Sequence, residues 1–171
     1  MHNKPILFED EMRVGTRTEL GRKWGPQGHR PLAPIHIGYS FVHLFVALAP
    51  LTGYVFAMFL PALNKACFRL FSQQLNQELS HPTLLVVDRA TAHQASLVAD
   101  TQLMLAHLPT ACPELNPVER FFEEVRRQLK SRVFETLDQA QTCVELVLQT
   151  YFAEPERVIE LAAYPYIRNT S

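Results

Sequence analysis

The sequence has few cysteines, no excess of charge of one sign and no apolar run long enough to span a membrane without interruption, and each shortage argues against a class of protein. Three cysteines without C-x-x-C spacing support neither a disulfide framework nor a zinc site, and they favour a reducing compartment. The net charge of −1 supplies no overall basic field for nucleic acid. A DNA partner would therefore need a local basic patch or another domain.

The apolar segments favour neither a signal peptide nor a membrane span. The N-terminus, MHNKPILFEDE, lacks a signal-peptide pattern because acids follow almost at once. The longest apolar stretch, residues 41–63, is interrupted by Pro50, Gly53 and Pro61, which favours two strands in a hairpin over one membrane helix. We therefore expect no membrane partner and a cytoplasmic location.

The order of the predicted elements indicates an α/β protein. With 171 residues, of which 47% are hydrophobic, the chain is expected to form one domain, residues 1–171, around a buried core. Strands are predicted at residues 5–8, 12–24, 35–49, 53–59, 83–87 and 103–108. Helices are predicted at residues 63–79, 92–99 and 116–133. A further helix is predicted to begin after an N-cap at Thr136, and a last one to begin at residues 154–156. Antiparallel strands followed by alternating helices and strands predict a mixed sheet, antiparallel among the N-terminal strands and parallel around residues 83–87.

A proline-rich loop that leads into an amphipathic helix organises the second half of the chain. The loop carries Pro109 and Pro113, and the helix is predicted to begin with Asn116 as N-cap and Pro117 at its first position. Glu119 then falls at the third position, where a capping box has an acid. Glu119 has two interpretations: it caps its own helix, or its carboxylate takes part in chemistry.

Three acids occupy positions where chemistry is common in such sheets. Asp10 is expected at the end of the first strand, Asp88 at the end of the apolar strand 83–87, and Glu119 at the helix start. Carboxylates gathered at one end of a sheet repel one another and suit a hard divalent cation such as Mg²⁺ or Mn²⁺. Two such ions, roughly 3.5–4 Å apart, activate a water and stabilise the leaving oxygen of a phosphodiester.

Four segments resemble the catalytic domain of DDE transposases of the mariner-type superfamily, in its bacterial insertion-sequence branch. They are FEDEMRVG, GRKWGPQGHRP, LLVVDRATAH and LPTACPELNPVERFFEEVRRQLKSRVF, and the P-E-L-N-P-V-E block with an upstream D-x-x-x-x-H is specific. The resemblance implies a ribonuclease-H-like fold, which has a mixed five-stranded sheet with helices on both faces. It also implies metal-dependent DNA cleavage and strand transfer at transposon ends. It implies that Asp10, Asp88 and Glu119 are the catalytic, metal-binding triad.

The resemblance also implies partners, and the chain departs from the family pattern in places. DNA, a second copy of the chain and two Mg²⁺ or Mn²⁺ ions are the implied partners, at the bacterial nucleoid. The family's N-terminal helix-turn-helix region is expected to be absent. Arg89 stands where the family often has Asn, and it either weakens metal binding or holds a DNA phosphate. These departures keep open a second function: a non-catalytic transposase remnant that binds DNA or a partner.

Several further residues are candidates for supporting roles. His93 either orients substrate or water, or satisfies a backbone group, and Asn116 is a second candidate beside the site. Glu9 and Glu11 are expected to point away from the metal site and to be solvated or paired. Glu123 either supports the site or forms a surface ion pair. The predicted contacts to the DNA backbone, with a solvated basic face as the alternative, are Arg120, Arg126, Arg127 and Lys130.

Overall fold

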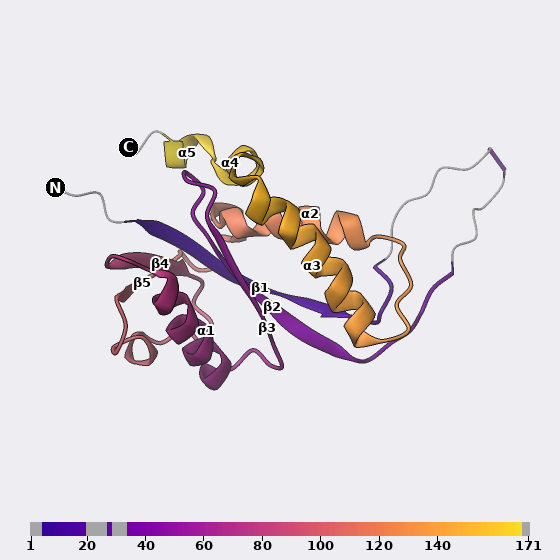
Figure 1. Cartoon of the computed structure of the whole chain (residues 1–171), viewed down its shortest axis with the longest axis horizontal. Helices are drawn as coiled ribbons and strands as arrows, with labels where there is room; N and C mark the ends of the chain where they lie inside the picture. Colours follow the sequence, from indigo (N-terminus) through magenta and orange to yellow (C-terminus); the bar gives the residue numbers. More distant parts are fainter. Residues whose placement is uncertain (1–4, 20–26, 29–33, 169–171) are drawn as a thin grey trace.

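The computed structural model describes residues 5–19, 27–28 and 34–168, which form a mixed five-stranded sheet between layers of helices (Figure 1). The strands are β1 (Ile6–Gly15), β2 (Phe41–Leu48), β3 (Val55–Leu60), β4 (Thr83–Val87) and β5 (Leu103–His107). Their spatial order is β3-β2-β1-β4-β5. The pairs β1–β2 and β2–β3 are antiparallel, and β1–β4 and β4–β5 are parallel. The predicted mixed sheet is confirmed.

The helices follow the predicted order, and the three longest begin at a capping side chain. They are α1 (Lys65–Glu78), α2 (Pro117–Leu129), α3 (Leu137–Ala153), α4 (Pro155–Ala162) and α5 (Pro165–Arg168). The predicted caps Asn116 and Thr136 are confirmed, because their side chains accept hydrogen bonds from the amides of Val118 and Gln139. The predicted helix at residues 92–99 was wrong: only Ala95–Leu97 form a short 3₁₀ turn. Among the described residues, no helix is both long and apolar enough to cross a membrane.

Strand β1 continues through the acids, so the prediction of separate strands at residues 5–8 and 12–24 was wrong. Asp10 pairs with Val46 of β2 in the middle of the antiparallel ladder, which corrects its expected place at a strand end. Beyond the acids, Met12 and Val14 are again buried, and this second apolar stretch anchors the rest of the strand. Residues 20–26 of the predicted second strand lie outside the described residues.

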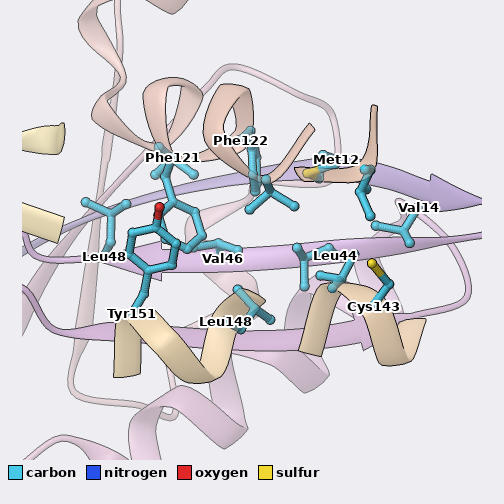
Figure 2. Packing of buried hydrophobic residues seen from close by; sticks show 14 of the residues in the cluster. Met12, Val14, Leu44, Val46, Leu48, Phe121, Phe122, Cys143, Leu148 and Tyr151 are labelled. Atoms are coloured by element: carbon cyan, nitrogen blue, oxygen red, sulfur yellow. The ribbon is translucent and has the colours of Figure 1, made fainter. Parts of the chain in front are cut away.

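The larger core lies between the sheet and helices α2, α3 and α4. Figure 2 shows side chains of α2 and α3 pointing onto strands β1 and β2. Phe121 and Phe122 of α2 are almost fully buried, and the ring of Tyr151 meets Phe121 edge-on with centroids 5.0 Å apart. Each buried aromatic side chain contributes on the order of 1.5–3 kcal/mol. This packing fixes α2, and with it the first helical turn, which carries Glu119.

Helix α1 covers the opposite face of the sheet. Its Phe68 and Phe71 are fully buried in a second core, where the ring of Phe71 lies 5.5 Å from that of Phe45. Because side chains alternate between faces along a strand, the odd-numbered residues of β1 point toward α1 and the even-numbered ones toward α2. The acids at positions 9 and 11 therefore lie on the opposite face from Asp10.

Candidate active site

Asp10, Asp88 and Glu119 come from three separate parts of the chain and line one cleft of about 380 Å³. Asp10 lies within β1, Asp88 directly follows β4, and Glu119 lies in the first turn of α2. The loop of residues 108–113 forms another wall of the cleft. The structure thus brings together the three acids that the sequence singled out, while their catalytic role stays a prediction.

The sheet register explains why Asp10 and Asp88 meet. Phe8 of β1 pairs with Val86 of β4, the last pair of that parallel ladder. Continuing the same register by two residues places Asp10 beside Asp88, since neighbouring strands lie about 4.8 Å apart. Both residues have even numbers in this register, so they belong to the face that α2 covers. The strand pairing therefore explains why both acids line the same cleft.

The environment of Asp10 disfavours its charged form. Burial, together with the negative charges of Glu119, Glu11 and Asp88, raises the pKa of Asp10 to about 7. The amide of Glu11, which donates to Asp10 Oδ1 at 2.9 Å, acts in the opposite direction. A carboxylate among three others is stabilised by a cation. The cleft therefore offers oxygen ligands of the kind that Mg²⁺ and Mn²⁺ prefer.

Asn116 joins the start of α2 to strand β1. Its Oδ1 caps the helix by accepting from the amide of Val118 at 3.1 Å. Its Nδ2 donates to the carbonyl of Glu9 at 3.0 Å and to Asp10 Oδ2 at 3.2 Å. The side chain is 1% exposed, so these bonds hold it in one orientation. The sequence predicted both the cap and a place beside the site, but not the bonds to β1.

Glu119 does not complete a capping box, although it occupies the position for one. The backbone N–H of Asn116, which a capping-box acid would bind, donates instead to the carbonyl of Pro113 at 2.8 Å. The Glu119 carboxylate lies 3.7 Å from Arg126 Nη1, and both side chains are about 40% exposed. Such an exposed pair contributes at most about 1 kcal/mol. The Glu119 carboxylate is therefore available to the cleft.

Asp88 is held by His93, which lies behind it. The Asp88 Oδ1 atom is 2.7 Å from His93 Nδ1 and also accepts from the amide of Ala90 at 2.7 Å. The imidazole contacts carboxylates on both sides, because its Nε2 lies 3.0 Å from Glu11 Oε1 and 3.7 Å from Glu9 Oε2. The ring nitrogens contact carboxylates, which argues against the backbone role considered for His93, while a role toward substrate or water stays a prediction.

Glu9 and Glu11 point away from Asp10 as predicted, and of the two expected states, solvated or paired, the structure shows the paired one, with His93. The Glu9 residue is 0% exposed, and the Glu11 side chain is 4% exposed. Burial raises the pKa of Glu9 well above its usual value, and the nearby charges of Glu11, Asp10 and Asp88 act in the same direction. Burial lowers the pKa of His93, but hydrogen bonds and charges from Glu11 and Asp88 outweigh this effect and raise it. This buried cluster of Glu9, Glu11 and His93 was missed in the sequence, where the strand alternation across residues 7–12 was its signal.

The basic residues near the cleft differ in how they are held. Arg89 lines the cleft, and its Nε donates to the carbonyl of Leu108 at 3.1 Å. Arg120 and Glu123 form an exposed ion pair at 3.1 Å, which supports the surface interpretation of Glu123. Arg127 pairs with Glu124 at 2.7 Å, and Lys130 directly follows the last residue of α2. Contacts of Arg120, Arg126, Arg127 and Lys130 with DNA stay predictions.

Comparison with solved structures supports the fold. The Mos1 transposase paired-end complex with the left transposon end is 21% identical, with a TM-score of 0.69 over 93% of this chain and 51% of that chain. The Mos1 strand transfer complex is 19% identical, with a TM-score of 0.67, and the match covers 93% of this chain and 54% of that chain. The mariner Mos1 paired-end complex with Mn is 18% identical, with a TM-score of 0.65, and the match covers 93% of this chain and 54% of that chain. The chain spans about half the length of these transposases.

The family comparison covers most of the chain. No curated protein matches the chain significantly in sequence. The family described as DDE superfamily endonuclease matches residues 5–141, which include all five strands, the cleft acids and helix α2. The ribonuclease-H-like fold that the resemblance implied is confirmed by the sheet and its structural relatives. The chain belongs to the DDE superfamily endonucleases.

Proposed function

We propose that the chain is a transposase catalytic domain, spanning residues 1–171, that cleaves DNA at transposon ends and joins the freed ends to target DNA. The observation that carries this proposal is that Asp10, Asp88 and Glu119 line one cleft from three separate elements. Three carboxylates that line one cleft can bind divalent metal ions, which promote the cleavage of phosphodiesters. Membership of the DDE superfamily endonucleases supports the same function.

The residues of the cleft fit Mg²⁺ or Mn²⁺. The three acids supply oxygen ligands only, and the raised pKa of Asp10 reflects burial and repulsion that a cation would relieve. We propose that carboxylate oxygens of Asp10, Asp88 and Glu119 would hold two such ions. Such ions, when bound, activate the attacking oxygen and stabilise the leaving oxygen. One of the similar Mos1 structures is a complex with Mn and another a complex with Mg, which supports this choice.

The reaction needs no covalent intermediate with the protein. In the cleavage step, a water oxygen bonds to the phosphorus at a transposon end, and the bond from phosphorus to the 3′ oxygen breaks. In the transfer step, the freed 3′-hydroxyl attacks a phosphodiester of the target, and one target oxygen leaves with its bonding electrons. Asn116, which donates to Asp10 Oδ2, would orient Asp10 in both steps. Arg89, which lines the cleft, would bind a phosphate.

The proposed partners are DNA and a second copy of the chain. The similar Mos1 structures are described as paired-end and strand transfer complexes, which supports DNA ends as substrate and a homodimer as the active form. The backbone contacts proposed on this side are Arg120, Arg126, Arg127 and Lys130, on or next to the helix that carries Glu119. We also propose that the chain is encoded by a bacterial insertion sequence and acts at the nucleoid.

Nicking of supercoiled plasmid in Mn²⁺ tests the proposed function. We expect the wild type to nick the plasmid and Asp88→Asn to lose at least about 100-fold in rate. Asp100→Asn, which changes an exposed acid paired with Arg69, is the control and should keep wild-type activity. Equal rates for the wild type and Asp88→Asn would remove Asp88 from the chemistry. A folded wild type without nicking or metal binding would favour the non-catalytic binding module.

A further inference from the structure

A buried cluster of Glu9, Glu11 and His93 lies on the α1 face of the sheet, behind the cleft. One ligand-type atom from each of the three residues lies within 4.8 Å of the others. Both carboxylate oxygens of Glu9 are buried without a hydrogen-bond partner. Burying three ionisable groups costs free energy that well-packed apolar side chains would avoid. Because these three groups lower the stability of the fold, we expect the cluster to serve a function.

The imidazole of His93 is constrained from several directions. Asp88 contacts its Nδ1 at 2.7 Å, and Glu11 contacts its Nε2 at 3.0 Å, with Glu9 behind at 3.7 Å. The ring of Phe68 lies against the imidazole with centroids 4.6 Å apart and an interplanar angle of 48°. A ring held at both nitrogens and on one face has one orientation. Its Nδ1 therefore occupies a fixed position beside Asp88.

The Asp88 side chain has more rotational freedom than a residue inside a strand would have, so a contact that fixes it has a larger effect. It directly follows β4, and its side chain is 53% exposed. An exposed aspartate samples several side-chain rotamers, and binding a cation would restrict them at a cost in free energy. The bonds from His93 and Ala90 both fall on Oδ1. Oδ2 is thereby left for the cleft in a defined direction.

We infer that His93, held from behind by Glu11 and Glu9, is a positioning residue that fixes the Asp88 carboxylate for the cation in the cleft. The inference rests on the proposed function, since it takes Asp88 as a metal ligand. Glu9 and Glu11 lie on the face of the sheet away from the cleft, yet they would affect the position of the Asp88 carboxylate because they hold the imidazole of His93. Groups that orient metal ligands in this way typically change metal affinity or activity 10–100-fold when removed.

Titration calorimetry with Mn²⁺ on the full chain tests the inference. The matched variants are His93→Asn, whose amide nitrogen lies near the position of Nδ1, and His93→Gln, whose amide nitrogen lies near that of Nε2. We expect His93→Gln to weaken Mn²⁺ binding about 10–100-fold, and His93→Asn, which keeps a donor to Asp88, to weaken it less. His81→Asn, an exposed histidine at the other end of β4, should bind Mn²⁺ like the wild type.

The outcomes separate this inference from the proposed function. If the wild type binds Mn²⁺ and a folded His93→Gln binds it equally tightly, the inference is overturned and the proposed function stands. If both His93 variants lose affinity equally and in step with their stability in urea, His93 is merely structural and the inference is again overturned. A wild type that binds no Mn²⁺ overturns both. Should His93→Gln fail to fold, Glu11→Gln replaces it: weaker binding supports the inference, and unchanged binding contradicts it.

Discussion

The amide of Asn116 lies 3.2 Å from the carboxylate of Asp10, so one side chain both begins helix α2 and orients an acid of the cleft. Asn116→Ala should lower the free energy of unfolding by about 2–3 kcal/mol, because a helix cap and a buried donor are both lost. It should also weaken Mn²⁺ binding. Asn64→Ala, which removes the equivalent cap of α1 far from the cleft, should cost about 1 kcal/mol and leave Mn²⁺ binding unchanged. Urea unfolding and calorimetry measure both effects, and equal Mn²⁺ affinities in both variants would contradict the role of Asn116.

The raised pKa of Asp10 predicts how stability depends on pH when chelator removes divalent ions. The folded state keeps this proton up to about pH 7, whereas the unfolded chain releases it near pH 4. The contribution of Asp10 to stability is therefore complete below about pH 4 and is lost as the pH rises to about 7. Asp10→Asn cannot lose a proton, so its stability should rise relative to that of the wild type as the pH increases from about 4 to about 8. Urea unfolding at both pH values measures the difference, and a gap independent of pH would be evidence against this environment for Asp10.

Two glutamates of α2 provide a matched pair for nicking assays. Glu119 lines the cleft, whereas Glu124 pairs with Arg127 away from it. Glu119→Gln should lower the nicking rate at least about 100-fold, and Glu124→Gln should change it less than about twofold. The Glu124 variant should lose about 1 kcal/mol of stability. The Glu124 side chain is only 17% exposed and also accepts a hydrogen bond from Gln128, but its partner Arg127 is exposed. Similar rates for the two variants would show that Glu119 is only a helix-start residue.

The position of α2 depends on its aromatic anchors. Phe121 is fully buried against Tyr151, so Phe121→Ala should lower the free energy of unfolding by about 3–5 kcal/mol. Phe152 is 49% exposed on α3 and provides the control, with an expected loss below about 1 kcal/mol for Phe152→Ala. Urea unfolding distinguishes them. A small loss for Phe121→Ala would mean that α2 is held by other contacts.

The sequence predicted those parts of the fold that depend on local signals. The apolar run of β4, the caps Asn116 and Thr136 and the change from strand to helical periodicity all identify their elements. These features act over a few residues, so one window of sequence contains them. The three acids that line the cleft were found in the same way, from their places beside such elements, although Asp10 was assigned to a strand end.

The path of β1 could not be predicted, because its acids are stabilised by residues far along the chain. Asp10 receives its bond from Asn116, 106 residues away, and Glu11 contacts His93, 82 residues away. Without those partners, three consecutive acids indicate a solvent-exposed strand end. The alternation of faces was visible, but the burial of Glu9 and Glu11 depends on helix α1 and on the imidazole. Tertiary contacts thus decided both the strand length and the buried cluster.

Anomalous scattering from a crystal soaked in Mn²⁺ tests most directly whether the three acids form one metal centre. We predict anomalous peaks in the cleft, within about 2.0–2.6 Å of carboxylate oxygens of Asp10, Asp88 and Glu119, and two peaks separated by about 3.5–4 Å. Loss of the peaks in Asp10→Asn crystals would support the assignment. Well-ordered crystals of the wild type with no peak in this cleft, or with Mn²⁺ bound elsewhere, would contradict it.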